Sequence, residues 1–432
     1  MRKFQIILSV IFGAFIVFAV LVFSGLIPSP KQAQDAMTKG NLVMWGTQDK
    51  ITMYQFFEKS LLGSDITIDY VQKSADTFPE DIIEALASGT GPDIIILPQE
   101  LTLRLEDKIA PFTPDLYAER DFMNAFIQNG EIFIRPNGIV ALPILTDPLV
   151  MYWNRDIFTN KNLVLPPKYW DEFLVMAPIL TEQDSANNIT KSAISFGEYQ
   201  NVTNAKDILA TLILQTGNPI VSNASGVLTP TLVGAPDSNI PSSSEVLRFY
   251  TDFADPLKTI YSWNRSLNES KKAFLAGDLA VYFGYASELY DLRAKNPNLN
   301  FDVAVVPQIR DWPRKTTFGR IEGLAVMKAS KAKSAAFYIS TILTNPTNSS
   351  IMASIFKTPS PSREVLAKTP ADPYMKVFYD SAIISKSWLD PNRISTGNIF
   401  KSTIEDINSG KTPVLDAVAN EQILFAQLFP QR

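Results

Sequence analysis

Carboxylates are the side chains on which chemistry in this chain would depend, because the sequence contains neither histidine nor cysteine. Their absence excludes the Ser-His-Asp and Cys-His nucleophile arrangements and the usual histidine-bearing zinc sites. It also leaves no disulfide framework and no thiol for lipid attachment. Glycoside hydrolysis and the binding of a hard cation need only carboxylates, and both are compatible with the sequence.

Four carboxylates could supply the pair that a glycosidase needs. Such a pair lies about 5 to 9.5 Å apart across a cleft, and the candidates are Asp49, Glu100, Asp147 and Glu322. Asp49 has a simpler explanation, since it stands at the predicted start of a helix, where an aspartate caps free backbone N–H groups. The carboxylates alone therefore do not distinguish a surface glycosidase from a binding protein.

The first of these carboxylates follow strands of a predicted parallel sheet. Apolar runs predict strands over residues 41–45, 66–71 and 93–97, with helical hydrophobic spacing in the two stretches between them. Strands that are separated by helical crossovers pair in parallel, and ligands bind beyond the carboxyl ends of such strands. Residues 46–49 and 98–100 are therefore expected to face any pocket.

Further along the chain, apolar runs predict strands over residues 138–143 and 149–154. We interpret the segment between them, residues 144–148, as the first crossing between two lobes. A later helix carries Trp170 on its apolar face, which favours core packing for this residue. Residues 218–244 are rich in Asn, Ser, Gly and Pro and are predicted to form a long surface excursion.

The overall composition predicts a folded, two-lobed body that does not bind nucleic acid. Hydrophobic residues make up 46% of the chain and charged residues 19%, as in globular proteins. The 39 basic residues are outnumbered by 44 acidic ones and form no basic cluster, which argues against nucleic-acid binding. The globular part is also too long for one ordinary core, so two lobes are expected.

The N-terminal segment, residues 1–27, is predicted to be a transmembrane signal anchor. Residues 4–27 carry no charge and are more numerous than the roughly 20 needed to cross a hydrocarbon core. Arg2 and Lys3 precede this run, so the positive-inside rule puts the N-terminus in the cytoplasm and the globular domain outside the cell. A cleaved signal peptide is the alternative. Residues 28–40 are predicted to be a linker.

Six segments in order resemble the extracellular solute-binding proteins of bacterial ABC importers, specifically the maltose-binding-like sugar group. Each segment alone is a weak signal, but together they cover residues 41 to about 345. The C-terminal stretch matches only loosely, through helical runs. The segments are Trp45-Gly46, 85–94 (ALASGTGPDI), Leu142-Pro143 with 151–158 (MYWNRDIF), 166–173 (PPKYWDEF), 274–282 (FLAGDLAVY) and 323–338.

The resemblance implies an α/β fold of the type II periplasmic-binding-protein kind, with two discontinuous lobes joined by a hinge. Lobe 1 would hold residues 41–143 with 301–356 returning to it, and lobe 2 would hold residues 144–300 with 357–432. Ligand would sit between the lobes, and hinge closure would bury it.

The resemblance also implies a function without catalysis, metal or cofactor. The chain would be a membrane-anchored extracellular component that binds a sugar or oligosaccharide and delivers it to an ABC permease in the same membrane. Another solute, such as a peptide, polyamine or sugar phosphate, is an alternative, as is a sensor or scaffold with the same fold. A phosphate-bearing ligand would favour a basic cleft, and only Arg320 among the candidates is positive, so a neutral ligand is favoured.

Candidate ligand-binding residues follow from the chemistry of sugars, which present flat C–H faces and rings of hydroxyl groups. Aromatic platforms and carboxylate or amide acceptors suit such ligands. Tyr285 follows a predicted strand, at the position where the maltose-binding group often places a stacking aromatic residue. The predicted set is Trp45, Thr47, Gln48, Asp49, Gln99, Glu100, Asp147, Tyr285, Arg320, Glu322 and Trp388.

Several of these residues also have explanations that involve no ligand. Trp45 could pack behind the sheet, and Gln99 and Glu100 could belong to a surface loop. Arg320 could simply pair with Glu322 at the surface. Both kinds of role are open on the sequence alone.

Overall fold

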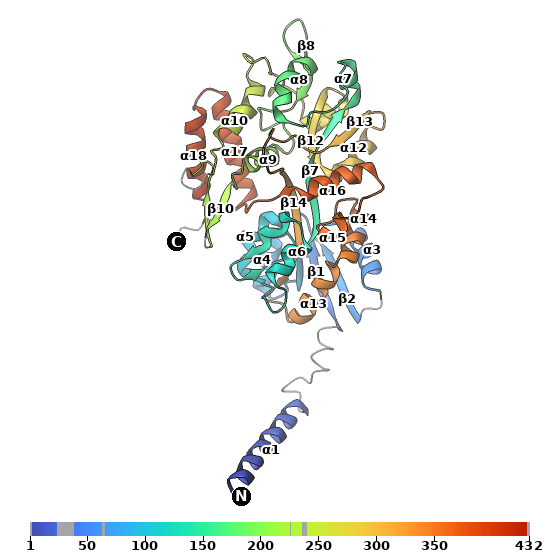
Figure 1. Cartoon of the computed structure of the whole chain (residues 1–432), viewed down its shortest axis with the longest axis vertical. Helices are drawn as coiled ribbons and strands as arrows, with labels where there is room; N and C mark the ends of the chain where they lie inside the picture. The colour runs from blue at the N-terminus through green and yellow to red at the C-terminus, as the bar shows by residue number, and fades with distance from the viewer. Residues whose placement is uncertain (1, 24–38, 63–64, 225, 236–239, 430–432) are drawn as a thin grey trace. The chain divides into compact units, whose positions relative to one another are not determined.

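The computed structural model describes residues 2–23, 39–62, 65–224, 226–235 and 240–429 (Figure 1). The chain divides into two compact units. Unit 1 comprises Met1–Ile95 and Val326–Ile342, and unit 2 comprises Ile96–Ala325 and Leu343–Arg432. The lobe boundaries expected from the sequence differ from this division and stay a prediction.

Unit 1 is built on a parallel β-α-β-α-β segment, which confirms the arrangement predicted from hydrophobic spacing. Strand β1 pairs in parallel with β2 on one side and β3 on the other. The buried residues of α3, Met53, Phe56 and Phe57, are those that the helical spacing marks. The elements are β1 (Lys39–Gly46), α3 (Lys50–Ser60), β2 (Asp65–Gln72), α4 (Phe78–Ser88), β3 (Ile94–Pro98) and α13 (Lys333–Leu343).

Asp93 joins three parts of unit 1. Its carboxylate accepts hydrogen bonds from the backbone N–H of Val43 at 3.0 Å and from the Ser330 hydroxyl at 2.5 Å. The backbone N–H of Met327 donates to the Asp93 carbonyl oxygen at 2.9 Å. The returning segment is therefore bonded to the first sheet through one aspartate.

The N-terminal residues form helix α1 (Arg2–Phe23). Among the residues that the structure describes, no helix is both long and apolar enough to span a membrane, so the predicted transmembrane segment has no support from the structure. Residues 24–38, which include the end of that segment and most of the predicted linker, lie outside the described residues. The last two residues of the predicted linker, Lys39 and Gly40, belong to β1.

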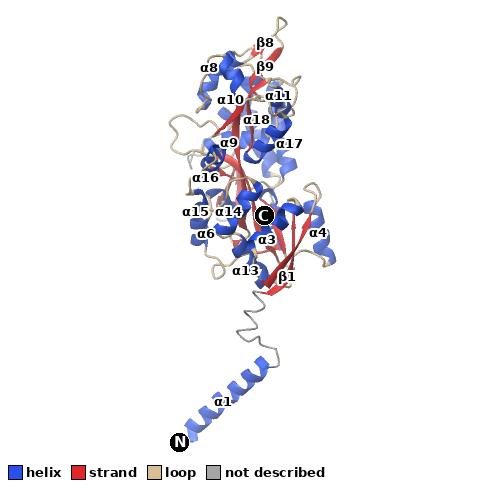
Figure 2. Cartoon of the chain, turned by 90° about the vertical axis from the view of Figure 1, so that its right-hand side faces the viewer, coloured by secondary structure: helices blue, strands red, loops and turns tan. Residues whose placement is uncertain are grey.

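Unit 2 contains a mixed sheet whose strand order is β14-β7-β12-β9-β8. Figure 2 shows these strands running between helices on both sides. The strands of unit 2 are β4 (Ile109–Ala110), β5 (Ile134–Arg135), β6 (Gly138–Ile139), β7 (Leu142–Asn154), β8 (Glu182–Gln183), β9 (Ile189–Ile194), β10 (Val221–Ala224), β11 (Val227–Pro230), β12 (Leu279–Tyr285), β13 (Phe301–Ala304), β14 (Thr317–Met327) and β15 (Ser385–Lys386).

Most of unit 2 outside the sheet is helical. Its α-helices are α5 (Thr102–Leu105), α6 (Glu119–Ala125), α7 (Arg155–Asn160), α8 (Phe173–Leu180), α9 (Ala205–Gln215), α10 (Ser244–Thr251), α11 (Ser270–Ala276), α12 (Leu289–Lys295), α14 (Pro346–Phe356), α15 (Arg363–Leu366), α16 (Pro373–Ile383), α17 (Arg393–Asn408) and α18 (Val414–Ala426). Its 3-10 turns are η1 (Gln99–Leu101), η2 (Glu106–Lys108), η3 (Gln128–Phe133), η4 (Trp170–Glu172), η6 (Asp252–Ala254) and η7 (Ala286–Glu288).

Strand β7 corrects the prediction of two separate strands around residues 144–148. It runs unbroken from Leu142 to Asn154 and pairs antiparallel with β14 and β12. Pro148 sits in this strand opposite Gly319. Residues 144–148, which we interpreted as a crossing between two lobes, therefore lie inside one long strand.

Two other predictions concern the periphery of unit 2. The predicted excursion over residues 218–244 contains a hairpin, β10 with β11. Asn218 fixes its base, because its side-chain N–H groups donate to the carbonyl oxygens of Thr231 and Pro241, both at 2.6 Å. Trp170 is buried in the core and donates from Nε1 to Gln215 at 2.5 Å, which confirms its predicted packing role.

One carboxylic acid in this core has no polar contact among the described residues. Glu421 of α18 is 1% exposed, and neither of its oxygens has a hydrogen-bond partner there. Burial raises the pKa of Glu421 from 4.5 to about 8. The folded state therefore holds this proton more tightly than the unfolded state.

The free energy of unfolding of the wild type should fall as the pH rises, because of Glu421. We predict that the Glu421→Gln variant lacks this fall. Between pH 4.5 and about 8 the unfolded chain releases the Glu421 proton while the folded chain keeps it, so the wild-type free energy of unfolding falls across this window. The variant should gain on the order of a few kcal/mol over wild type between pH 5 and pH 8. Urea unfolding at both pH values measures the gain.

Glu364→Gln on α15 is the matched control, because Glu364 is exposed. Parallel pH profiles for wild type and Glu421→Gln would contradict the prediction.

Candidate functional site

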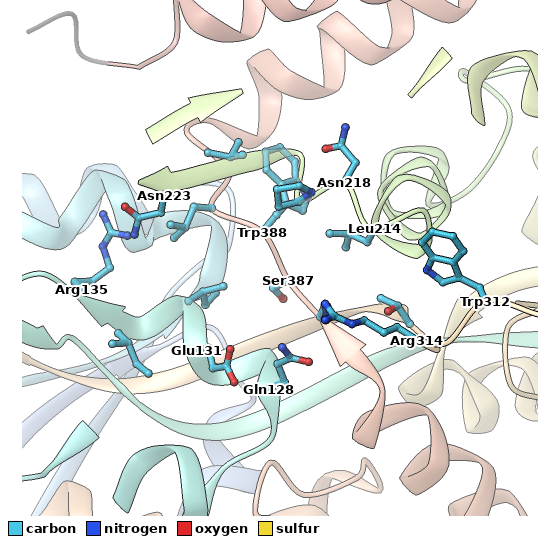
Figure 3. Close-up of a pocket in the computed structure, with 18 residues that line it drawn as sticks. Gln128, Glu131, Arg135, Leu214, Asn218, Asn223, Trp312, Arg314, Ser387 and Trp388 are labelled. Carbon is cyan, nitrogen blue, oxygen red and sulfur yellow. The ribbon is translucent and has the colours of Figure 1, made fainter. Parts of the chain in front are cut away.

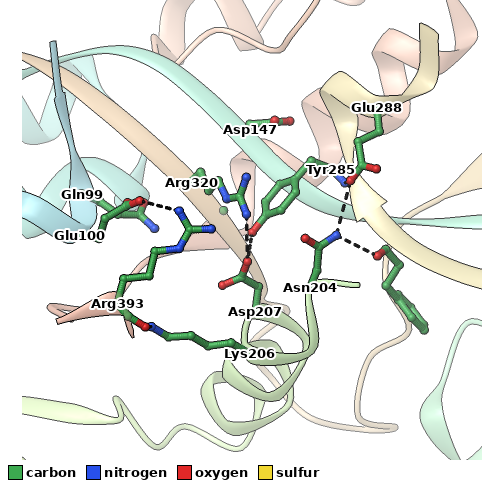
Figure 4. Close-up of polar contacts among 12 residues, drawn as sticks. Gln99, Glu100, Asp147, Asn204, Lys206, Asp207, Tyr285, Glu288, Arg320 and Arg393 are labelled. Carbon is green, nitrogen blue, oxygen red and sulfur yellow. Dashed lines mark hydrogen bonds and ion pairs between the residues drawn. The ribbon is translucent and has the colours of Figure 1, made fainter. Parts of the chain in front are cut away.

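Four residues predicted from the sequence meet at one small pocket of unit 2. They are Gln99, Glu100, Arg320 and Trp388, and the structure adds Phe318 and four charged residues that sequence analysis missed. Figure 4 shows Gln99, Glu100 and Arg320 together with three of the added charged residues. The added charged residues are Lys206, Asp207, Asp390 and Arg393. The pocket thus combines residues from η1, which follows β3, from the start of β14, from the first turn of α9 and from the segment that leads into α17.

Tyr285 and Arg320 are in direct contact beside this pocket. The guanidinium carbon of Arg320 lies 3.8 Å from the centre of the Tyr285 ring. Asp207 holds both residues, since its Oδ2 accepts from the Tyr285 hydroxyl at 2.5 Å and lies 3.3 Å from Arg320 Nη2. Tyr285 is only 2% exposed, so the ring expected to stack on a sugar is covered by an arginine in this structure.

Asp147 lies opposite Arg320 in the β7–β14 ladder. Its carboxylate accepts hydrogen bonds from the backbone N–H of Ser287 at 3.0 Å and from the Ser287 hydroxyl at 2.6 Å. Burial raises the pKa of Asp147 to about 6, and the hydrogen bonds from Ser287 limit the rise. A carboxyl group at this position can exchange a proton near neutral pH.

Glu322 lies two residues after Arg320 on β14, so both side chains are on the same face of the strand. Burial is the main cause that raises the pKa of Glu322 to about 8, and the negative charges of Glu100 and Asp147 add to it. At neutral pH Glu322 is therefore largely protonated and can donate a hydrogen bond. The charges of Glu100 and Asp147 thus act on Glu322, although both residues are far from it in sequence.

The side-chain oxygen of Gln99 is used in hydrogen bonds within the protein. Its side-chain oxygen accepts from the backbone N–H of Ile321 at 2.7 Å and from the Ser387 hydroxyl at 2.8 Å. The Ser387 hydroxyl also contacts the carbonyl oxygen of Gly319. One buried amide therefore bonds β14 to the segment that carries Trp388.

The residues that sequence analysis missed form ion pairs at this pocket. Glu100 lies 3.2 Å from Arg393, and Lys206 contacts Asp390 in a pair that is almost fully buried. Lys206 also donates to the Thr396 hydroxyl at 2.6 Å. An acidic residue in a first helical turn, as Asp207 is, signals only a helix start, so no sequence signal placed these side chains together.

Trp388 is largely buried. Its indole stacks on Phe425 of α18, with ring centres 6.0 Å apart and planes 28° apart. Lys206 Nζ lies 5.4 Å from the centre of the Trp388 ring. Much of this side chain is therefore part of the unit 2 core.

Four predicted residues belong to unit 1. Asp49 caps α3 by accepting from the backbone N–H of Thr52 at 2.8 Å, as its alternative interpretation predicts. Trp45 is buried, with Lys73 Nζ 3.9 Å from its ring centre. The carbonyl oxygen of Gln48 accepts from a tyrosine hydroxyl of β2 at 2.8 Å, and Thr47 is half-buried. Ligand contact by these residues stays a prediction.

Among the described residues, no group of three or more Asp and Glu side chains is arranged to hold a metal ion. The pocket therefore offers hydrogen bonds, paired charges and aromatic surface.

The sequence and fold now define the class of protein. The family model for the bacterial extracellular solute-binding protein matches residues 46–347, more than half of the chain. This protein belongs to that family, which confirms the resemblance seen in its segments.

Individual relatives agree with this assignment. A galactooligosaccharide-binding protein of Bacillus subtilis (strain 168) is 21% identical over 338 residues, which cover 74% of this chain and 73% of the relative. The crystal structure of a cyclic alpha-maltosyl-1,6-maltose binding protein from Arthrobacter globiformis matches with a TM-score of 0.74 at 16% identity, over 90% of this chain and 99% of that one.

The GacH receptor of Streptomyces glaucescens, solved unliganded and with acarbose, matches with a TM-score of 0.68 at 16% identity, over 90% and 98% of the two chains. At these identities the solved structures establish the fold, an α/β solute-binding protein. Each of the three relatives is a binding protein or receptor.

The hydrogen bonds of Gln99 give a testable stability prediction. Gln99→Ala leaves the buried Ile321 N–H without its acceptor, while the Ser387 hydroxyl keeps the carbonyl oxygen of Gly319. An unsatisfied buried group costs about 1–3 kcal/mol. We expect the free energy of unfolding to fall by at least the lower value, measured by urea denaturation. Gln128→Ala, at an exposed glutamine, is the control, and an equal, small effect of both changes would contradict the role of Gln99.

Proposed function

We propose that this protein is the extracellular sugar-binding component of an ABC importer, which binds a sugar or oligosaccharide reversibly and delivers it to the permease. The observation that carries the proposal is the cluster of carboxylates and guanidinium groups around this small pocket, of about 20 Å³, in which Arg320 lies on the ring of Tyr285. Charged side chains make the stronger hydrogen bonds to hydroxyl groups, and a tyrosine face suits the C–H face of a sugar.

The charge balance at this pocket favours a neutral solute. Its three acidic side chains are matched by three basic ones: Glu100 with Arg393, Asp207 with Arg320, and Asp390 with Lys206. A phosphate-bearing sugar or a polyamine would leave part of this set without a counter-charge, and such a group is costly when buried. The names of the relatives, which bind galactooligosaccharide, cyclic maltosyl-maltose and acarbose, support a carbohydrate.

Two parts of the proposal rest on the sequence and on family membership. Family membership supports an extracellular position for the globular domain and a permease partner. Attachment through residues 4–27 rests on the uncharged run alone. The mass of the mature protein purified from membranes tests it, since a chain that begins near residue 29 or 32 means cleavage.

We predict that at least one oligosaccharide related to those ligands raises the melting temperature of the purified protein. A ligand that binds only the folded state at about 100 times its Kd adds about 2.7 kcal/mol to the free energy of unfolding. A thermal-shift screen with maltotetraose, mannobiose, galactooligosaccharides and acarbose measures this.

A screen without any shift would count against a carbohydrate ligand. The same sugars should be recovered intact after incubation. Hydrolysis that is lost in Glu100→Gln would show the glycosidase alternative to be right.

We predict that Tyr285→Ala weakens sugar binding by about 1–3 kcal/mol, because it removes the aromatic face and frees Arg320 and Asp207. Calorimetric titration with the best ligand of the screen measures the loss. Tyr290→Ala is a matched control, since Tyr290 also carries a cation over its ring, Lys357 at 4.2 Å, but is exposed, and Lys357 is not a residue of the pocket. Equal affinities of both variants and wild type would remove Tyr285 from the site.

A further inference from the structure

Unit 2 contains a second cavity, of about 290 Å³, that shares only Trp388 with the pocket described above (Figure 3). Its lining comes from η3 and β5, from Leu214 of α9, and from residues 217–223, 312–316 and 386–389. The volume is near the lower limit of the roughly 300–1,000 Å³ that small-molecule sites occupy. It is therefore suited to a single sugar ring rather than to an oligosaccharide.

The lining of this cavity carries more positive than negative charge. Arg135, Arg314 and Lys386 line it, against one acidic residue, Glu131. Burial, and then the positive charge of Arg314, lowers the pKa of Lys386. Figure 3 shows the Arg314 side chain extending toward Ser387 in the middle of the cavity. An anionic group placed beside Arg314 and Lys386 would relieve the repulsion between these two cations.

Arg135 adds an unused hydrogen-bond donor. Its side chain is 5% exposed, and its Nε pairs with Glu106 at 2.9 Å. Its Nη1 is buried and has no hydrogen-bond partner among the described residues. Figure 3 shows the guanidinium group turned toward Asn223 of β10. A buried donor without an acceptor is unfavourable, but Figure 3 draws Arg135 at the opposite end of the cavity from Arg314, so Arg135 bounds the cavity and is not part of the site at Arg314.

An aromatic ring completes the lining. Trp312 is 43% exposed and lies across from Gly217, where an added Cβ would be 3.7 Å from the indole ring. The indole leaves room for the apolar face of a sugar ring, and guanidinium groups bind carboxylates in a two-pronged geometry. Both features point to one kind of ligand.

We propose that this cavity binds a sugar acid, a single pyranose ring with a carboxylate, which contacts Trp312 through its C–H face and Arg314 and Lys386 through its carboxylate. This site is distinct from the pocket of the proposed function, and its ligand is charged where that pocket favours a neutral one. Binding of a sugar acid in this cavity and binding of a neutral sugar in the first pocket can therefore be tested independently.

Calorimetric titration of the full chain with D-glucuronate, D-glucose and inorganic phosphate tests the site. We expect saturable binding of D-glucuronate that is at least ten-fold weaker in Arg314→Gln and in Lys386→Gln, with D-glucose much weaker than D-glucuronate. Arg314 is exposed and Lys386 half-buried, so both variants should fold. Lys376→Gln, an exposed lysine paired with Asp380 on α16, is the matched control.

Three results would overturn the proposal: no saturable binding of D-glucuronate, unchanged affinity in both charge variants, or phosphate binding at least as tightly as D-glucuronate. Tyr285→Ala separates the two sites, since it should weaken neutral sugars and leave D-glucuronate binding intact. Loss of both would place the acid in the first pocket and also overturn the proposal.

Discussion

The antiparallel register of β7 determines where the candidate site forms. On one side Asp147 pairs with Arg320 of β14, and on the other Leu149 pairs with Tyr285 of β12. Residues two apart on a strand share a face, and paired residues on neighbouring strands share it too. Arg320 and Tyr285 therefore project on the same side of β7 and can meet. A one-residue slip of either partner would turn its side chain to the opposite face.

Charge pairing is the second constraint on this arrangement. Buried ion pairs add little net stability, because the cost of removing both charges from water offsets their attraction. Removing one partner is strongly destabilising, because it leaves the other charge buried without compensation. The Lys206–Asp390 pair is the most buried of the three at the pocket, and it holds the start of α9 against the segment before α17. The paired charges thus favour solutes that bring hydroxyl groups and no net charge.

The sequence predicts the regular parts of this fold well, because local periodicity specifies them. Strand β1, helix α3 and the packing of Trp170 follow from hydrophobic spacing that the folded chain keeps. The continuity of β7 could not be predicted, because it depends on pairing with β12 and β14, which come much later in the chain. Asp207 and Arg393 were missed for a related reason. Their partners Arg320 and Glu100 are 113 and 293 positions away, and nothing local to Asp207 or Arg393 encodes such contacts.

The arginine that covers Tyr285 also bears on the kinetics of recognition. If a solute stacks on the Tyr285 ring, the Arg320 guanidinium group must first move aside. Binding would then have two steps, an encounter followed by a side-chain rearrangement. Association would then be slower than the usual rates for an open, preformed site, and it would speed up when salt weakens the bond between Arg320 and Asp207. The same arginine, returning to the ring, would help to expel the solute when it is released.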